Sequence, residues 1–265
     1  MNKKTIIKNI IKIILFGYLI LNSCQKVKTD NNEFTIYLKN FNAKNDNFRY
    51  IDIEINENNI YKRKNDIVAD YNNLYRKELS KEEKVKITNL IDDIKINNLT
   101  HSYIKNKYQS KYHYEFYLLK NGNMRNVKVF SDTLPSKLSK LITYMEELSS
   151  KNSYQKIKPS INGVQGIDIW KIVKYPNDTI KLSEFESYRF WKNLINYKGK
   201  IDTVKQVTPI SFDYTFILSD LLRKTYEEKK IKNLYLKKDT LYVKYRDNSL
   251  YKLNNNFDTF VKELK

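Results

Sequence analysis

The sequence YHYEFYLLKNGNMRNVKVF, residues 112–130, carries the clearest structural signal in the chain. Two runs rich in apolar and aromatic residues, 112–119 and 124–130, lie on either side of the dipeptide Asn121-Gly122. Asn-Gly between such runs is the strongest short-range hairpin signal, because a tight two-residue turn needs positive φ at both positions. The stretch therefore predicts two antiparallel strands joined by a tight turn.

Toward the N-terminus, residues 34–38 and 50–55 also have the composition of strands, and 60–62 returns after a turn. In the second run, side chains alternate between apolar and acidic: Ile51, Ile53 and Ile55 share one face, and Asp52 and Glu54 share the other. Alternation with a period of two is typical of a strand with one face in the core and one in solvent. We therefore expect a half-buried strand here.

Two amphipathic helices are expected before residue 150. Ser80 and Glu83 have the spacing of a capping box, in which each side chain bonds the backbone of the other residue. Pro135 is suited to the start of a second helix. Apolar residues follow each start at helical spacing: Ile87, Leu90, Ile91 and Ile94 in the first, and Leu138, Leu141, Ile142, Met145 and Leu148 in the second.

Residues 151–160 are polar and contain Pro159, which indicates a linker. Beyond the linker we expect a strand at 167–173, a turn at 176–178, and a helix opened by a Ser183–Glu186 capping box and closed near Gly199. The apolar run at 214–218 is ambiguous between strand and helix. A hairpin of 234–236 and 241–245 follows, and then a short terminal helix through Phe257, Phe260, Val261 and Leu264. The predicted fold class is α+β, with two small modules of antiparallel strands and packed amphipathic helices. The modules are predicted at 33–150 and 161–265.

The N-terminus has the parts of a secretory signal. Lys3, Lys4, Lys8 and Lys12 precede any acid, and residues 13–21 are uncharged and almost wholly apolar. A basic segment followed by roughly 7–15 apolar residues is typical of a signal peptide. A transmembrane helix needs about 20 apolar residues, and a span of that length would include Lys8 and Lys12. The sequence therefore favours a cleaved signal over a membrane-spanning anchor.

The signal ends in Leu21-Asn22-Ser23-Cys24, with the single cysteine of the chain. This tetrapeptide resembles the lipobox of bacterial lipoproteins. The resemblance implies cleavage between Ser23 and Cys24, diacylglycerol on the sulfur of Cys24 and acylation of the new amino group with a fatty acid such as palmitate. Residues 1–23 would then be the signal peptide and 24–32 a tether. Gln25 resembles the sorting pattern that sends lipoproteins to the outer membrane of Gram-negative cells.

The formal charge of the chain is +19, of which the four signal lysines account for 4, leaving +15 in residues 24–265. Charges of both signs alternate along the chain, as in residues 81–84 and 227–230, which is typical of solvated surfaces. A nucleic-acid partner is therefore not expected. A basic body suits an anionic membrane or an anionic surface polysaccharide.

Common catalytic and ligand-binding motifs are missing from the sequence. The five glycines form no phosphate-binding loop or dinucleotide fingerprint, and Gly163-Val164-Gln165-Gly166 is predicted to be a loop. His101 and His113 lack the spacing of metal ligands. Acids adjacent in sequence, such as Asp92-Asp93, do not face each other on a helix. We therefore expect no metal, no cofactor and no catalytic residue.

One segment has the composition of a binding surface. Residues 101–114 interleave tyrosines with lysines, a pattern that can stack on rings while pairing with anionic groups. The alternative is a loop that enters a strand whose tyrosines form cross-strand pairs. If the segment binds a ligand, Tyr108, Lys111 and Tyr112 are the residues expected to do so.

The lipobox, the composition and the short-strand α+β plan together resemble cell-envelope lipoproteins of AT-rich Bacteroidota, a resemblance that implies no particular activity. The first hypothesis is a non-enzymatic, lipid-anchored envelope protein that binds a protein or glycan partner. The alternatives are an envelope hydrolase whose acids converge only in the fold, and an immunity or inhibitor protein held at the membrane. The sequence leaves the oligomeric state open.

Overall fold

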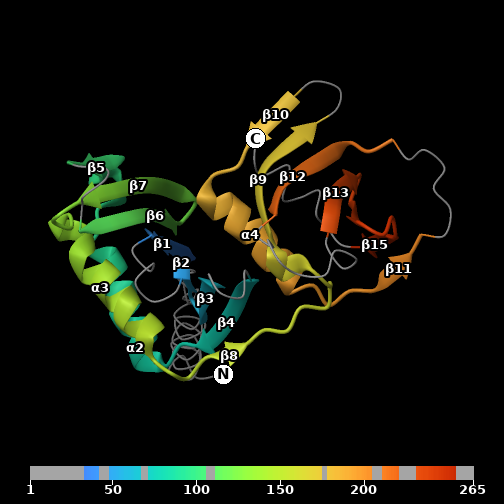
Figure 1. The fold of residues 1–265 in the computed structure, drawn as a ribbon. Helices are drawn as coiled ribbons and strands as arrows, with labels where there is room; N and C mark the ends of the chain where they lie inside the picture. Colours follow the sequence, from blue (N-terminus) through green and yellow to red (C-terminus); the bar gives the residue numbers. More distant parts are fainter. Residues whose placement is uncertain are drawn as a thin grey trace, which may run out of the picture. The chain divides into compact units, whose positions relative to one another are not determined.

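The computed structural model describes residues 33–41, 48–66, 71–105, 111–174, 178–204, 211–220 and 231–254. These residues, from Phe34 onward, lie in one compact unit, Phe34–Lys265. They form two sheets and three α-helices, which confirms the predicted α+β class (Figure 1). None of the described helices is both long and apolar enough to cross a membrane.

Sheet 1 has the strand order β5-β7-β6-β1-β2-β3-β4-β8. Its pairs are antiparallel except for β5 and β7, which are parallel. The strands are β1 (Phe34–Asn40), β2 (Phe48–Asn56), β3 (Asn59–Asp66), β4 (Tyr71–Glu78), β5 (Ser102–Ile104), β6 (Tyr112–Lys120), β7 (Asn123–Ser131) and β8 (Gln155–Lys156). The predicted hairpin is confirmed as β6 and β7, and its turn residues Asn121 and Gly122 have φ of 50° and 79°.

Sheet 2 is antiparallel throughout, with the order β10-β9-β12-β13-β14-β15-β11. Its strands are β9 (Ile167–Lys174), β10 (Asp178–Lys181), β11 (Ile201–Thr203), β12 (Tyr214–Asp220), β13 (Ile231–Lys237), β14 (Thr240–Tyr245) and β15 (Leu250–Asn254). The apolar run at 214–218 is therefore a strand. The expected terminal helix lies outside the described residues.

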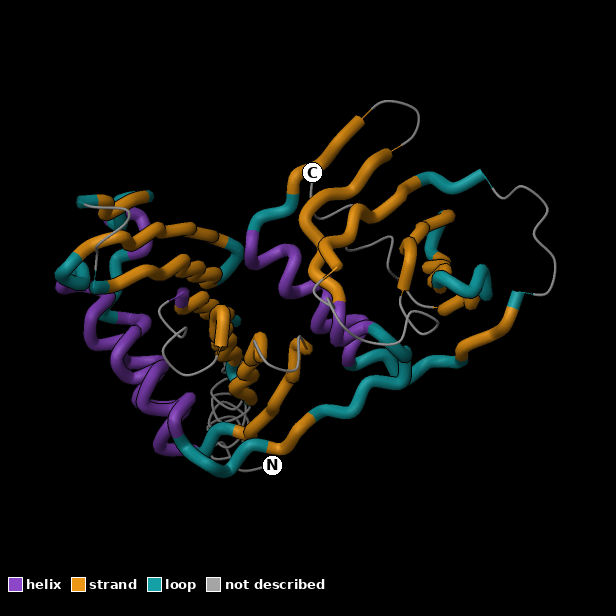
Figure 2. Tube along the Cα trace, viewed as in Figure 1, coloured by secondary structure: helices purple, strands orange, loops and turns teal. Residues whose placement is uncertain are grey.

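The helices are α2 (Lys81–Asp92), α3 (Ser136–Ser150) and α4 (Glu184–Ile195), drawn in purple in Figure 2. Both predicted capping boxes are present: Ser80 with Glu83 opens α2, and Ser183 with Glu186 opens α4. Helix α3 begins directly after Pro135. The helix starts were predictable because each depends on residues within one turn of the chain.

Helices α2 and α3 cover one face of sheet 1, called here the first face. The buried residues of this core are aliphatic for the most part, and include Ile36, Leu38, Ile53 and Ile55 from the strands, Ile87 and Ile91 from α2, and Leu141 and Met145 from α3. Burial of such side chains contributes roughly 1.5–3 kcal/mol each. The isoleucine face predicted for residues 50–55 is confirmed.

The second face of sheet 1 is buried too. Asp52 and Glu54 have relative exposures of 0% and 3%, so the prediction of a half-buried strand is wrong. Helix α4 covers this face, since Tyr37 of β1 lies 5.0 Å from the ring of Tyr188 and 5.2 Å from that of Phe185. The same core continues from α4 to the inner face of sheet 2. Alternation identified the faces of β2, but a helix that begins at residue 184 covers its acidic face.

Residues 155–156 of the expected linker form β8, which pairs with β4. Further along, η3 (Val164–Gly166) is a short 3₁₀ helix that replaces the loop expected at Gly163–Gly166. Val164 is fully buried there. The module boundary proposed at 151–160 stays a prediction, and the chain on either side of it contributes to one shared core.

Candidate functional site

The residues predicted to carry the membrane anchor, Ser23 and Cys24, lie outside the described residues, as does Tyr108. Lys111 and Tyr112 are described, at the start of β6. The Lys111 backbone N–H donates to Asp132, and its Nζ lies 5.2 Å from the Tyr112 ring centroid. Tyr112 packs partly against the core under α2 and α3. The proposed binding set of three residues stays a prediction.

Both histidines have neighbours within the protein. His101 Nδ1 lies 3.3 Å from the Asn126 carbonyl oxygen, and its Nε2 lies 2.9 Å from a guanidinium nitrogen of Arg125. The His113 ring packs edge-on against Phe130, with centroids 5.2 Å apart. Within the described part of the chain, no three His, Cys, Asp or Glu side chains are grouped so that they could hold a metal ion.

Two buried carboxylates on the second face of sheet 1 are candidates for chemistry. Asp52 accepts a hydrogen bond of 2.6 Å from the Tyr37 hydroxyl on Oδ1 and one from Arg63 Nε on Oδ2. Arg63 itself is 1% exposed, and its guanidinium carbon lies 5.0, 5.3 and 5.1 Å from three aromatic rings: Tyr50, Tyr188 and Trp191. Both oxygens of Asp52 are therefore used inside the protein.

Glu54 lies two residues further along β2, on the same face as Asp52, and has an equivalent arrangement. Lys192 Nζ of α4 lies 2.5 and 2.6 Å from its two oxygens. Burial, followed by the negative charges of Glu54 and Asp52, raises the pKa of Tyr188 well above its usual range. Burial and the charge of Asp52 do the same for the pKa of Tyr37. These tyrosines are neutral at physiological pH. Both carboxylates have partners within the protein, so we assign the cluster to structure.

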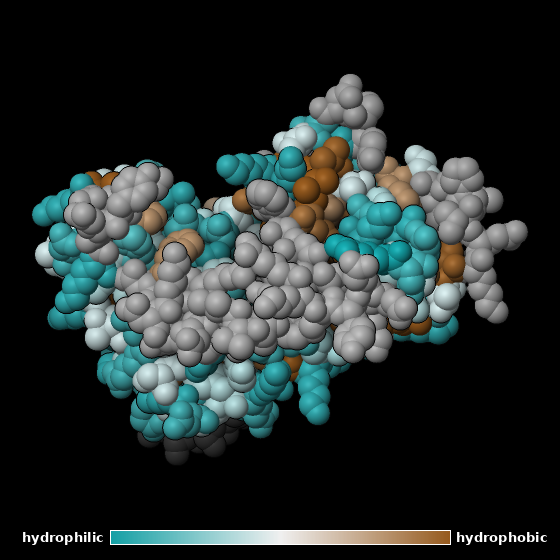
Figure 3. Space-filling view, in the orientation of Figure 1, coloured by the Kyte–Doolittle hydropathy of each residue, from teal (hydrophilic) through white to brown (hydrophobic). Residues whose placement is uncertain are grey.

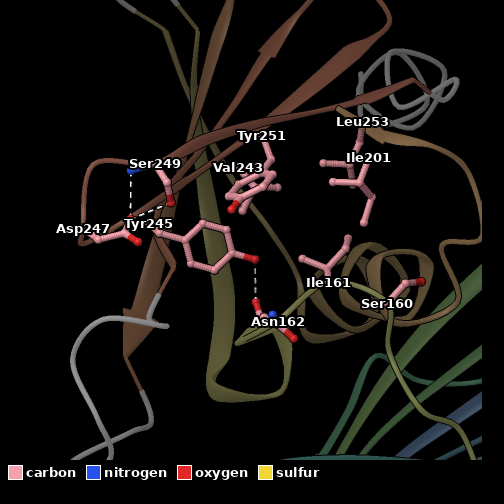
Figure 4. Close-up of a pocket in the computed structure, with 10 residues that line it drawn as sticks. All are labelled: Ser160, Ile161, Asn162, Ile201, Val243, Tyr245, Asp247, Ser249, Tyr251 and Leu253. Carbon is pink, nitrogen blue, oxygen red and sulfur yellow. Dashed lines mark hydrogen bonds between the residues drawn. The ribbon is translucent and has the colours of Figure 1, made fainter. Parts of the chain in front are cut away.

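A cavity of about 260 Å³ lies on the inner face of sheet 2 (Figure 4). Its walls come from β14, β15, β11 and the loop that precedes η3. Cross-strand pairing places Val243 opposite Tyr251, and Leu253 of β15 opposite Ile201 of β11, so that these side chains share one face. Ile161 of the loop faces them from the other side.

Two tyrosines form one corner of the cavity. The rings of Tyr245 and Tyr251 have centroids 5.4 Å apart and stand at 84° to each other. The Tyr245 hydroxyl donates a hydrogen bond of 2.8 Å to the Asn162 carbonyl, which ties β14 to the loop. The Tyr251 hydroxyl has no hydrogen-bond partner among the described residues. Tyr245 is thus committed to the fold, whereas Tyr251 is available to a ligand.

The loop wall of the cavity is held by hydrogen bonds on both sides. Ser160 Oγ donates to the Tyr197 carbonyl, and Trp191 Nε1 donates to the Val164 carbonyl at 2.9 Å. Gln165 Nε2 donates to Asn73 Oδ1 of β4 at 3.0 Å. Gly163 adopts φ of 75°, a conformation that glycine enters without strain. A wall fixed in this way loses little conformational entropy when a ligand binds.

The carboxylate and the aliphatic side chains lie at different ends of the cavity. Asp247 and Ser249 form one end, and Ile201 and Leu253 lie at the other, near the exposed Ser160 (Figure 4). Val243 and Leu253 are at most 1% exposed. The backbone N–H and hydroxyl of Ser249 both donate to Asp247 Oδ1, at 2.8 and 2.5 Å, and lower the pKa of that carboxyl. Oδ2 has no partner among the described residues. Among the described residues that line the cavity there is no lysine or arginine.

Sequence reasoning missed this cavity. The alternation in 241–245 predicted the strand, but Val243 and Tyr245 then look like core residues. What opens a cavity over them is the loop at 160–162, which lies 83 residues from Tyr245 in the chain. The one local signal was an acid in a turn, Asp247, with a tyrosine on each side at positions 245 and 251.

A second hollow, of about 590 Å³ and more open to solvent, lies along α2, between Lys81 and Asp93. On the face shown in Figure 3, most of the coloured surface is hydrophilic and hydrophobic residues form small separate groups. The large hydrophobic side chains that are exposed in the described regions, Val85, Ile104 and Met124, lie on three different elements or turns. No family model matches the chain, and comparison with curated proteins and with solved structures finds no similar protein.

Proposed function

We propose that this chain is a lipid-anchored cell-envelope protein that binds a small ligand or a glycan unit in the sheet 2 cavity, without converting it chemically. The observation that carries the proposal is the cavity itself. It combines an aliphatic end, an aromatic corner and, at the other end, an ionised carboxylate. A concave, mostly apolar site with a few placed polar groups is the usual form of a small-molecule site.

The anchor part of the proposal depends on the residues before the body. A basic segment, an apolar run and the tetrapeptide Leu21–Cys24 follow one another as in bacterial lipoproteins. One acyl chain gives only marginal membrane binding, whereas two or three chains on Cys24 hold a protein to a bilayer nearly permanently. The +15 charge of residues 24–265 favours a position beside an anionic surface.

The composition of the cavity favours binding over hydrolysis. Glycosidases use two carboxyl groups about 5–10 Å apart, and Asp247 is the one carboxylate among the described residues of the cavity lining. A general acid needs a raised pKa to hold its proton at neutral pH. The pKa of Asp247 is instead lowered by Ser249. Asp247 is therefore suited to accept hydrogen bonds from a ligand.

The anchor is tested by expressing the full chain and a Cys24→Ser variant with radiolabelled palmitate. We expect label and membrane association in the parent, and an unlabelled, uncleaved precursor in the variant. Lys26→Ser, two residues after the cysteine, is a control that keeps the label. A parent that takes up no palmitate, or a Cys24→Ser protein that matures and partitions like the parent, would contradict the lipid anchor.

The cavity is tested separately, on the full chain purified in detergent, with a panel of monosaccharides, small amines and single-ring aromatics. Ligand-observed NMR measures binding, and Tyr251→Ala reports whether the sheet 2 cavity is the place. We expect at least one class to bind and to lose affinity in the variant. If no probe binds, or if Tyr251→Ala leaves every affinity unchanged, the proposed binding role is wrong.

A further inference from the structure

We propose that the cavity takes a single pyranose ring that carries a methyl-bearing substituent, as in 6-deoxyhexoses and acetamido sugars. This inference rests on the proposed function and specifies its ligand. The chemistry shared by the two kinds of sugar is a hydroxylated ring with one small apolar group. The argument comes from the size, the charge and the two unlike ends of the cavity.

Size limits the ligand to one ring. An apolar cavity of roughly 150 Å³ holds a benzene molecule, and sites for drug-sized ligands occupy about 300–1,000 Å³. At about 260 Å³, the cavity is large enough for one six-membered ring with its substituents and too small for two. An oligosaccharide would therefore place a single terminal or branch unit inside.

Charge excludes anions from the cavity. The described residues of its lining include one carboxylate and no lysine or arginine, although residues 24–265 carry a net +15. Ser249 donates two hydrogen bonds to Asp247 Oδ1, so the carboxyl stays ionised at neutral pH. An anionic ligand would be repelled at the entrance. The basic charge of the protein thus has no role inside this cavity.

The aromatic corner also disfavours a quaternary or primary amine. Cation recognition by aromatics works best where several ring faces surround the charge. Tyr245 and Tyr251 stand at 84°, so that the edge of one ring meets the face of the other and the pair forms a corner, not a cage. A flat ring with C–H groups on its face can lie against a tyrosine face in such a corner. A pyranose offers that surface.

The two unlike ends of the cavity define the substituents. Asp247 Oδ2 accepts hydrogen bonds and the Tyr251 hydroxyl can donate or accept, which suits neighbouring ring hydroxyls. The other end is aliphatic, formed by Ile161, Ile201, Val243 and Leu253, of which all but the half-buried Ile201 are buried. A hydroxymethyl group pushed into that end would bury its hydroxyl without a partner, at a cost of roughly 1–3 kcal/mol. A methyl group fits there without such a loss.

The first test compares matched sugars on the unmutated full chain in detergent, so it does not depend on how a variant folds. L-Fucose and L-galactose differ by one hydroxyl at C6, and N-acetyl-D-glucosamine and D-glucose differ by the acetamido group. We expect the methyl-bearing member of at least one pair to bind about three-fold tighter or more, since one buried methyl group has roughly that effect. The pair that discriminates identifies the 6-deoxy or the acetamido source.

The second test locates the sugar. Tyr251→Ala should weaken binding of the preferred sugar by about tenfold or more, because it removes the stacking surface. Tyr242→Ala is the matched control, because Tyr242 lies on the neighbouring strand with its side chain on the opposite face of sheet 2. The control should leave the affinity unchanged. Equal losses in both variants would contradict the assignment of the cavity.

Failure of the inference differs from failure of the proposed function. Amines or aromatic probes that bind the parent, and bind Tyr251→Ala more weakly, would show that the cavity binds ligands. If, in the same experiments, neither sugar pair favours its methyl-bearing member, the sugar inference is wrong and the binding role remains. If no probe of any class binds, the binding role itself is overturned. Preference for the methyl-bearing sugar, lost in Tyr251→Ala and kept in Tyr242→Ala, supports both.

Discussion

Two regions of this protein collect polar and aromatic residues, and they use them differently. Under α4, Asp52 receives donors on both oxygens, from Tyr37 and from Arg63. In the sheet 2 cavity, Asp247 receives both of its donors on one oxygen, from Ser249. The first carboxylate is 0% exposed and complete within the fold, whereas the second keeps an acceptor that faces a cavity.

The difference separates polar residues that hold the fold from polar residues that are available for binding. Buried charges are tolerated when they are paired and fully hydrogen-bonded. In the cluster under α4, Asp52 and Glu54 are each paired with a cation, so removal of either pair should affect stability. The cavity leaves hydrogen-bond capacity unused, so changes there should affect ligand affinity and leave stability nearly unaltered. The following predictions test this division, from the largest effect on stability to the smallest.

Asp52→Ala should have the largest effect, because it removes the buried carboxylate that pairs with the guanidinium of Arg63. Breaking a buried ion pair by removing one member destabilises proteins by about 3–5 kcal/mol. Denaturant unfolding followed by circular dichroism measures the change. Asp202→Ala, whose carboxylate pairs with an exposed Lys200, is the control and should change stability by less than about 1 kcal/mol. Similar losses of unfolding free energy in the two variants would contradict the distinction between the buried and the exposed ion pair.

Lys192→Ala should come next. Its Nζ pairs with Glu54, which is 3% exposed, while Lys192 itself keeps a side-chain exposure of 15%. Because solvent can reach the vacated position, we expect a loss of about 2–3 kcal/mol, below that for Asp52→Ala. Unfolding midpoints in the same denaturant series give the value. A loss under about 1 kcal/mol would show that the ion pair of Glu54 and Lys192 contributes little to the stability of the cluster under α4.

Glu83→Gln should show an intermediate effect that depends on pH. Burial alone would raise the pKa of Glu83, but hydrogen bonds from Lys77, the Ser80 backbone and Lys151 lower it to about 2. A lowered folded-state pKa means that the ionised group contributes stability above the unfolded pKa of about 4.3, and loses that contribution as pH falls toward 2.

We therefore expect Glu83→Gln to reduce the unfolding free energy by about 1–2 kcal/mol at pH 7, with the gap to the parent closing between about pH 4.3 and 2. Unfolding curves at a series of pH values measure the gap. Glu82→Gln, one position earlier and fully exposed, is the control. A gap that stays constant down to pH 2 would contradict the charged network at the start of α2.

Asp247→Asn should have the smallest effect on stability, less than about 0.5 kcal/mol, because the residue is exposed and asparagine keeps the acceptor used by Ser249. Its effect on binding should be larger, since the amide is a weaker acceptor for ligand hydroxyls than a carboxylate. Unfolding and sugar titration on the same sample give both values. A variant that unfolds easily and binds normally would reverse the proposed division.

Much of the fold was predictable because its signals are local. Asn121-Gly122 and the capping boxes of Ser80 and Ser183 depend on residues within a few positions. Short strands were missed, among them β4, β5 and β15. In β4, YNNLYRKE, the inward side chains include Asn72, whose burial depends on hydrogen bonds to Asn65 and to the Ile167 carbonyl. Such partners cannot be read from the local sequence.

The two polar regions could not be predicted either, because their partners are also distant in the sequence. The burial of Glu54 depends on Lys192, which lies 138 residues later. The cavity depends on the loop at Asn162, whose carbonyl receives the Tyr245 hydroxyl across 83 residues. Residues 101–114 were predicted to be a binding segment because of their composition, but Tyr112 packs partly against the core under α2 and α3. Unused hydrogen-bond capacity beside a cavity is visible only in three dimensions.

The central claim is that the sheet 2 cavity binds a ligand through Tyr251 and through hydrogen-bonding groups that the fold leaves unused. The most direct measurement is a paired one on the full chain in detergent, which records unfolding and binding of the preferred methyl-bearing sugar for the parent and for Tyr251→Ala. The account predicts an affinity about tenfold lower or weaker still, in a protein that remains folded although it loses the packing of Tyr251 on the core. An unchanged affinity in a folded Tyr251→Ala protein would contradict it.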